Sequence, residues 1–377
     1  MFQKPLPIEY TKLSDEETAS RIQSAKQKLG SDLVILGHHY QRDEIIQHAD
    51  YRGDSYKLAK DASKHPEAKY IVFCGVHFMA ESADILTQPE QIVILPNLAA
   101  GCSMADMANH FQVRNSWKQI SEVLGDIELV SEGVGPKVVP VTYINSAANL
   151  KSFVGEHGGT VCTSTNAPSA LEWAFTQGEK ILFFPDQHLG RNTGVKMGYD
   201  PQRDMIVWDP FKPNGGNTAE DIKRATFILW KGHCSVHKRF TVEQIEASRK
   251  SHPGVNVLVH PECELEVVQA SDFNGSTEYI IQKVETAEAG TSWAIGTEIN
   301  LVDRLAKENP EKTIFCLDPQ ICPCATMYRI HPSFLLYVLE KLVDGEVINQ
   351  ISVPGDVTHW ARVALQRMLD IGANPKD

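Results

Sequence analysis

The sequence predicts an α/β protein built from three repeated units with parallel sheets. Short β-rich runs that end in polar residues alternate with helical stretches, which is typical of parallel α/β structure. One succession of motifs recurs three times, and each copy ends at a cysteine. A chain of 377 residues, 42% of them hydrophobic, is long enough to form several small cores. We therefore expect three related α/β units, each with a parallel sheet.

The first strand of each copy ends in polar residues, and a hydroxyl residue follows at a nearly constant distance. In the first copy the strand 33–36 leads to His38-His39-Tyr40, and a helix is expected over residues 42–49 before Ser55. The three pairs are His38 and Ser55 (55 − 38 = 17), Asn145 and Ser164 (164 − 145 = 19), and His260 and Thr277 (277 − 260 = 17).

A second strand is expected over residues 70–76, 180–186 and 292–298, and a third strand leads to a cysteine. The three cysteines are Cys102, Cys234 and Cys324. Ligands of parallel α/β sheets bind at the carboxyl ends of the strands. Three such units facing one axis would bring the strand-end residues and the three cysteines together.

The domain boundaries follow from turn-forming stretches between the copies. We expect the first repeat, with an N-terminal extension, over residues 1–120, the second over 121–250 and the third over 251–331. Residues 332–377 are expected to form two closing amphipathic helices.

Composition and charge exclude several classes of function. A net charge of −12 and a pI near 5.6 argue against nucleic acid or an anionic membrane as partner. The acidic N-terminal segment does not resemble a secretory signal, and no apolar run is long enough to span a bilayer. We therefore expect a cytoplasmic protein, in which eight cysteines point to metal binding or catalysis rather than to disulfides.

Cys102, Cys234 and Cys324 all fall in polar or Gly/Pro-rich loops. Three soft ligands from distant segments suit an iron–sulfur cluster, and a missing fourth cysteine leaves one iron open as a Lewis acid. Two alternatives stay open: a zinc site that adds His233 or His237, and Cys322 as the third ligand in place of Cys324.

Eleven motifs, in order from Leu33 to Met327, resemble the quinolinate synthase family, the A protein of bacterial NAD biosynthesis. They are GHHYQ (37–41), GDS (53–55), FCGVHFMAES (73–82), GCSMAD (101–106), TYINS (142–146), CTSTNA (162–167), PDQHLG (185–190), WKGHCSVH (230–237), HPEC (260–263), NGST (274–277) and CPCATM (322–327). The family usually has Asn where this chain has His39, whose role is unassigned.

The resemblance implies a pseudo-threefold arrangement of three Rossmann-like α/β/α domains, each with a parallel sheet, around a central iron–sulfur cluster. It implies condensation of iminoaspartate with dihydroxyacetone phosphate to quinolinate, phosphate and water, and functional coupling to L-aspartate oxidase. One 4Fe-4S cluster per subunit would be bound by Cys102, Cys234 and Cys324. Substrate contacts would fall on His38, Ser55, Tyr143, Ile144, Asn145, Ser164, His260, Pro261, Glu262 and Thr277.

The chemistry of the residues themselves assigns further roles. Because the protein is acidic, anionic substrates need local donors, which Ser55, Ser164, Ser276, Thr277, His38, His237 and His260 offer. Carbon–carbon bond formation and dehydration require repeated proton transfer, for which Glu262 beside His260 offers a base. Tyr40 and Tyr143 offer phenolic protons. The predicted catalytic set is Glu262, Tyr40, His38, His260 and Tyr143.

Two other functions compete with this interpretation. A cluster-dependent hydro-lyase would use the same open iron to remove water without joining carbons. A non-catalytic iron–sulfur sensor would need fewer convergent polar residues and a basic DNA-binding helix, which the sequence lacks.

Overall fold

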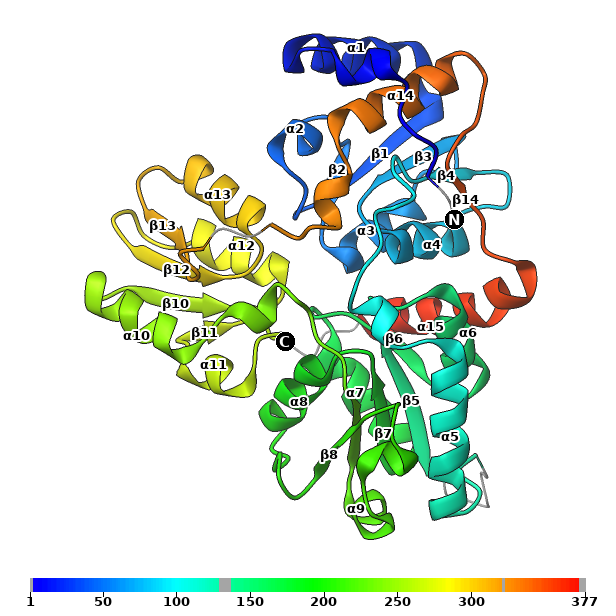
Figure 1. The fold of residues 1–377 in the computed structure, drawn as a ribbon, viewed down its shortest axis with the longest axis vertical. Helices are drawn as coiled ribbons and strands as arrows, with labels where there is room; N and C mark the ends of the chain where they lie inside the picture. The colour runs from blue at the N-terminus through cyan, green and yellow to red at the C-terminus, as the bar shows by residue number, and fades with distance from the viewer. Residues whose placement is uncertain (1–2, 129–136, 321–322, 373–377) are drawn as a thin grey trace. The chain divides into compact units, whose positions relative to one another are not determined.

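The computed structural model describes residues 3–128, 137–320 and 323–372. The chain divides into two compact units, Met1–Cys102 with Thr297–Val353, and Ser103–Gly296 with Pro354–Asp377. Three mostly parallel sheets with helices between the strands confirm the predicted α/β class (Figure 1). The domain boundaries at residues 120, 250 and 331 stay predictions. Within the described residues, no helix is both long and apolar enough to cross a membrane.

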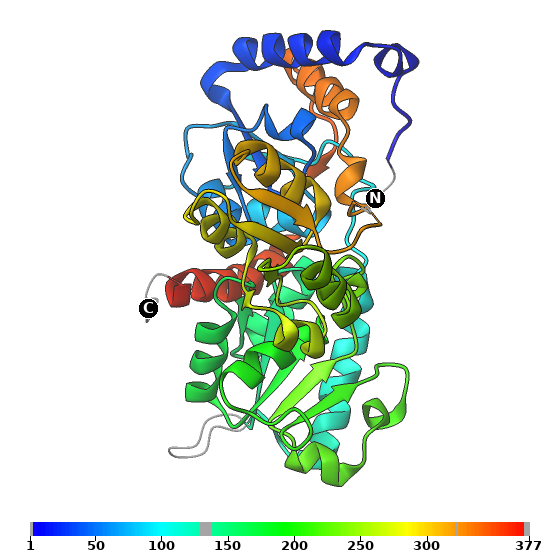
Figure 2. The ribbon, with the colours of Figure 1, turned by 90° about the vertical axis from the view of Figure 1, so that its left-hand side faces the viewer.

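The first unit contains a five-stranded sheet in the order β14-β4-β3-β1-β2, in which only β14 is antiparallel to its neighbour. The buried strands β1 and β3 are apolar on both faces, as expected for a parallel sheet covered by helices. Helix α1 packs against α14, and the two lie side by side in both ribbon views (Figures 1 and 2). The elements are α1 (Asp15–Leu29), β1 (Leu33–His38), α2 (Asp43–Ile46), β2 (Tyr51–Gly53), α3 (Ser55–Ala62), β3 (Tyr70–Cys74), α4 (His77–Leu86), β4 (Ile92–Ile94), α13 (Ile299–Glu308), β13 (Thr313–Cys316), α14 (Pro332–Val343) and β14 (Gln350–Ile351).

The second unit contains a parallel five-stranded sheet in the order β6-β5-β7-β9-β8, and a further set in which β10 pairs in parallel with β11 and β12. Its elements are α5 (His110–Leu124), β5 (Val138–Tyr143), α6 (Ala148–Glu156), β6 (Thr160–Cys162), α7 (Ala167–Gln177), β7 (Lys180–Phe184), α8 (Gln187–Lys196), β8 (Met205–Trp208), α9 (Ala219–Arg224), β9 (Phe227–Trp230), α10 (Val242–Ser251), β10 (Asn256–Val259), α11 (Leu265–Ala270), β11 (Phe273–Asn274), α12 (Thr277–Glu285), β12 (Ser292–Gly296) and α15 (Gly355–Gly372).

The strand register repeats in three places, which supports the predicted triplication. The last residue of each first strand pairs with the end of a short edge strand, as His38 with Gly53, Tyr143 with Cys162, and Val259 with Asn274. A serine follows two residues later in every copy (55 − 53, 164 − 162 and 276 − 274 all equal 2), namely Ser55, Ser164 and Ser276. The register therefore makes Ser276, rather than Thr277, the counterpart of the other two serines.

The helix expected over residues 42–49 is shorter than predicted, because only Asp43–Ile46 is helical. The chain must return to pair β2 with β1. Asp50 makes this return by donating its N–H to the Ile35 carbonyl oxygen (2.8 Å) and accepting the N–H of Ile35 on Oδ2 (2.8 Å). A helix continued to residue 49 would leave no room for that turn.

The two closing helices exist as predicted, and α15 packs closely on α6 (Figure 1). A Cβ at Gly155 of α6 would lie 2.0 Å from the Trp360 carbonyl oxygen of α15.

We expect Gly155→Ala to lower the free energy of unfolding by about 1–3 kcal/mol, because the backbones of α6 and α15 must move apart to admit the added methyl group. Urea unfolding followed by circular dichroism measures this. Gly355→Ala, where nothing lies within 4 Å of the added carbon, is the control. Equal stability of the two variants would contradict the close approach.

Candidate active site

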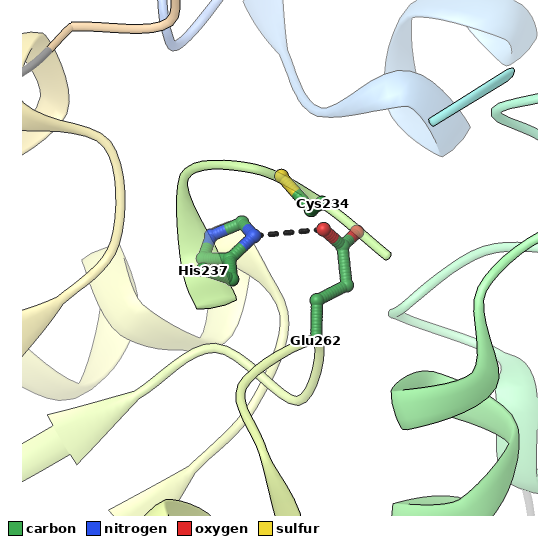
Figure 3. Close-up of side chains that lie close together, drawn as sticks. All are labelled: Cys234, His237 and Glu262. Carbon is green, nitrogen blue, oxygen red and sulfur yellow. Dashed lines mark hydrogen bonds and ion pairs between the residues drawn. The ribbon is translucent and has the colours of Figure 1, made fainter. Parts of the chain in front are cut away.

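A buried acid–base network lies at the carboxyl end of β10 in the second unit. The strand ends at Val259, and the following loop carries His260, Pro261 and Glu262. Cys234 and His237 come from the loop after β9, and Figure 3 shows Glu262 reaching toward the His237 imidazole from the neighbouring loop. The side chains of His237, His260 and Glu262 are at most 3% exposed. Strands β9 and β10 belong to different sheets of this unit, so the network joins loops at the carboxyl ends of two parallel sheets.

Both carboxylate oxygens of Glu262 accept hydrogen bonds. The Tyr143 hydroxyl donates to Oε1 at 2.5 Å, and the Nδ1–H of His237 donates to Oε2 at 2.7 Å. An ionised carboxylate can only accept, so both partners must present a hydrogen to it. Charge-assisted hydrogen bonds of this kind are short and strong. The arrangement joins a base, a phenol and an imidazole in one continuous path for a proton.

The local backbone fixes His260 as a neutral imidazole. The backbone N–H of Glu262 donates to Nδ1 of His260 at 3.3 Å, so the ring proton sits on Nε2. Its ring stacks on His237 with centroids 4.3 Å apart and an angle of 14° between planes. Burial, with the nearby charge of His237, lowers the pKa of His260 to about 3. His260 is therefore an uncharged donor at neutral pH.

Glu262 and Asp186 are two buried carboxyls whose proton affinities are pushed apart. Burial raises the pKa of Glu262, but the charge of His237 and the hydrogen bonds from His237 and Tyr143 outweigh it, so the pKa lies below its ordinary value. Burial and the negative charge of Glu262 raise the pKa of Asp186 well above its usual range. A pair separated in this way has one ionised and one protonated member. Glu262 is therefore the ionised member of this pair.

Buried polar side chains hold the two loops that carry this network. Asn192 of α8 donates from Nδ2 to the carbonyl oxygens of Pro261 and Cys263, at 2.8 Å each. In the loop after β5, Ser146 donates its hydroxyl hydrogen to the Tyr143 carbonyl oxygen at 2.8 Å, and the fully buried Lys151 donates to the Ser146 carbonyl oxygen. These contacts fix the loop backbones that position Tyr143 and Glu262.

The predicted residues of the first unit form a smaller polar group at the end of β1. The backbone N–H of Tyr40 donates to Nδ1 of His38 at 3.1 Å, which repeats the geometry of Glu262 on His260. The Tyr40 hydroxyl lies 2.8 Å from the Thr297 hydroxyl oxygen. Asn300 donates to the Tyr40 carbonyl oxygen at 3.3 Å. His38 is 4% exposed and is therefore buried, as His260 is.

The three cysteine loops have the same local structure. A short 3-10 helix starts three residues after each cysteine (105 − 102, 237 − 234 and 327 − 324 all equal 3). The N-cap of the next α-helix follows seven residues after each cysteine (109 − 102, 241 − 234 and 331 − 324 all equal 7). The cysteines that share this frame are Cys102, Cys234 and Cys324. Cys322, the alternative to Cys324, lies outside the described residues.

The described cysteines fall into two groups. Cys102, Cys234, Cys316 and Cys324 are partly exposed, whereas Cys74, Cys162 and Cys263 are buried. Burial raises the pKa of Cys74 to about 12 and lifts the pKa of Cys162 and of Cys263 above the ordinary thiol value. Burial also raises the pKa of Cys316 to about 11. A thiolate ligand is disfavoured at all four of these positions.

The structure thus brings together five of the residues predicted from sequence: Tyr143, Cys234, His237, His260 and Glu262. Within the second unit, Ser276 caps α12 and Thr277 begins that helix. Within the first unit, Ser55 begins α3. Ile144 is buried, Ser164 is half-buried, and Oδ1 of Asn145 is buried without a hydrogen-bond partner in the described parts of the chain. Asn192 was missed, because a polar residue in the middle of a helix gives no signal that it holds another loop.

A parallel α/β chain with a buried acid–base network at its strand ends belongs to the class of enzymes that act on small molecules. Comparison with known proteins defines the family. The family model described as quinolinate synthetase A protein matches residues 20–370, and the chain belongs to this family. It is 58% identical to the quinolinate synthase of Corynebacterium glutamicum, over 98% of this chain and 91% of the relative. It is 55% identical to that of Streptomyces coelicolor, over 94% of this chain and 89% of the relative. The quinolinate synthase of Herpetosiphon aurantiacus is 54% identical, over 97% of this chain and 96% of the relative.

Proposed function

We propose that this chain condenses iminoaspartate with dihydroxyacetone phosphate to quinolinate, phosphate and water, as a carbon–carbon bond-forming transferase of NAD biosynthesis. The observation that carries the proposal is the Tyr143–Glu262–His237 network in a member of the quinolinate synthetase family. Functional coupling to L-aspartate oxidase, as a source of iminoaspartate, and a cytoplasmic location belong to the same proposal.

Cys102, Cys234 and Cys324 would hold a 4Fe-4S cluster. The donor set fits such a group, because these three cysteines share one loop frame, are partly exposed, and are the soft ligands that iron–sulfur clusters use. When bound, a cluster with one iron lacking a cysteine supplies a Lewis acid that polarises a substrate oxygen or nitrogen.

A mononuclear zinc site is the alternative. Ligand atoms of Cys234, His237 and Glu262 lie within 4.8 Å of one another. However, His237 and Glu262 are hydrogen-bonded to each other at 2.7 Å. That hydrogen bond occupies Nδ1 of His237 and Oε2 of Glu262, and it favours the use of these residues as an acid–base pair.

The chain's own residues would carry the proton transfers. Glu262 accepts a proton from a substrate carbon or hydroxyl, and its hydrogen bond from His237 stabilises the carboxylate between steps. Tyr143 can donate its phenolic proton while Glu262 takes up another. In the first unit, Tyr40 and His38 offer a second hydroxyl and imidazole. Ser55, Ser164, Ser276, Thr277, Asn145, Pro261 and Ile144, with His260, are proposed to contact the substrates.

The proposal is tested by supplying both substrates to the anaerobically purified protein and measuring quinolinate by chromatography. A hydro-lyase would give a dehydrated product from one substrate and no quinolinate. An iron–sulfur sensor would consume neither substrate. Omitting each substrate in turn is the control, since quinolinate should form only when both are present.

Binding at a single open iron predicts a specific spectroscopic result. Three cysteine ligands leave one of the four irons without protein sulfur. A substrate analogue with a thiol or hydroxamate group is therefore expected to change the Mössbauer parameters of about a quarter of the iron. An unchanged spectrum under saturating, inhibitory analogue would mean that the analogue binds away from the metal.

A further inference from the structure

Two of the three repeats place a buried carboxyl at the start of the helix that follows their second strand. The N-cap of this helix lies two residues after the strand in every repeat (76 − 74, 186 − 184 and 298 − 296 all equal 2). The caps are Val76 of α4, Asp186 of α8 and Glu298 of α13. Asp186 and Glu298 are both 0% exposed, so each carboxyl is completely buried within its own unit.

Glu298 links its helix to the backbone of Cys324 within the first unit. Its Oε2 accepts the N–H of Asn300 at 2.8 Å, which is the capping contact. Its Oε1 accepts the N–H of Cys324 at 3.1 Å and the side-chain amide of Asn300 at 2.9 Å. Asn300 also donates to the Tyr40 carbonyl oxygen, so the cysteine loop, the helix and the strand-end tyrosine are joined.

Asp186 has the same relation to Cys234 within the second unit. Its Oδ1 accepts the N–H of Leu189 at 2.7 Å, which is the capping contact. The backbone N–H groups of His188 and Cys234 also face the carboxyl and favour its charged form. Its Oδ2 is buried and has no hydrogen-bond partner in the described residues. Capping of α8 uses only Oδ1 of Asp186. The cap therefore does not explain why Oδ2 is also buried beside the loop that carries Cys234.

The first repeat shows how a cysteine loop is held without such a carboxyl. Val76 makes no side-chain cap, and the first helical residue, His77, donates its N–H to the Ala100 carbonyl oxygen at 2.8 Å, two residues before Cys102. The second repeat has the same backbone contact, from Gln187 to the Gly232 carbonyl oxygen at 3.0 Å. The carboxyls are therefore an addition to a shared backbone frame.

We propose that Asp186 and Glu298 are positioning residues, each of which fixes the backbone of the cysteine that would bind the cluster in its unit. The inference rests on the proposed function, since it concerns how the cluster ligands are held. A buried acceptor that binds the cysteine N–H limits the directions in which the sulfur can point. Replacing a group that holds a metal ligand in place typically lowers the affinity for the metal by about 10- to 100-fold.

Serine variants separate the positioning role from helix capping. Serine remains a good N-cap but is too short to reach the cysteine loop, so Asp186→Ser and Glu298→Ser keep the cap and lose the second contact. Asp186→Asn and Glu298→Gln keep the length and an acceptor oxygen. Ser14→Ala removes the exposed cap of α1, whose hydroxyl accepts the Glu17 N–H at 3.1 Å, and controls for a general loss of helix stability.

After anaerobic reconstitution, the measurements are iron and sulfide per chain, the melting temperature, and the rate at which an iron chelator bleaches the cluster absorbance. We expect the two serine variants to lose iron about 10- to 100-fold faster than the unchanged protein. We expect Asp186→Asn and Glu298→Gln to retain iron nearly as long as the unchanged protein, and Ser14→Ala to retain it equally long.

Three outcomes would overturn the inference. Serine variants that lose iron at the unchanged rate would show that the caps do not hold the loops. Should the serine variants fail to fold, Asn and Gln variants that fold but lose iron rapidly would show that an acceptor oxygen is not what matters. An unchanged protein that binds no iron–sulfur cluster would overturn the proposed function as well, which distinguishes the two failures.

Discussion

Replacing Glu262 with Gln is expected to reduce turnover by roughly 10²- to 10⁴-fold, the usual contribution of a general acid–base. Gln fills the same buried space and can still accept one hydrogen bond, from Tyr143 or from His237. It cannot take up a proton from substrate. Iron content and substrate binding should therefore stay close to those of the unchanged protein while the rate constant for turnover falls.

The matched control for this prediction is Glu264→Gln, the same chemical change two residues further along the chain. Glu264 is half-buried at the start of α11 and makes no side-chain cap. We expect its turnover to equal that of the unchanged protein. Steady-state quinolinate formation, with iron analysis of each sample, measures both variants. Turnover of Glu262→Gln within a few-fold of the control would remove Glu262 from the mechanism.

Replacing Cys324 with Ser is expected to abolish both the cluster and activity, whereas Cys322→Ser should retain both. The shared loop frame supports this choice, because the 3-10 helix and the helix cap stand at the same distances from Cys324 as from Cys102 and Cys234. Proline between the two cysteines fixes its own φ and biases the residue before it toward extended geometry. We therefore expect the sulfurs of Cys322 and Cys324 to point in different directions.

Iron and sulfide analysis after anaerobic reconstitution, with absorbance near the cluster band, distinguishes the two variants. We expect Cys322→Ser to lose at most part of its rate or its sensitivity to thiol oxidants. A cluster that is lost with Cys322 and kept without Cys324 would show that the register of the third loop is wrong by two residues.

The fold class could be predicted because parallel strands, buried on both faces, give continuous apolar runs such as residues 33–36. The positions at which the strands end were predicted less accurately. The second strands were expected to reach residues 76, 186 and 298 but end at Cys74, Phe184 and Gly296. The last two residues of each predicted strand turn into the next helix, and their apolar or polar identity does not distinguish a strand end from a cap.

The candidate site could be predicted as a set of residue types but not as a network. Spacing identified Glu262 and His260, since they follow a strand directly. The contact between Tyr143 and Glu262 joins residues 119 positions apart, and only the folded chain brings them together. The positions of Asp186 and Glu298 inside the protein could not be predicted, because nothing local in the sequence signals burial at a helix N-terminus.

The most direct test of the whole account measures iron, sulfide and quinolinate formation in one series of anaerobic preparations with graded cluster content. We expect about four irons and four sulfides per chain in the fully loaded protein, and turnover that rises in proportion to iron and vanishes without it. Quinolinate formed at full rate by iron-free protein, or a fully loaded protein that forms none from both substrates, would contradict the account.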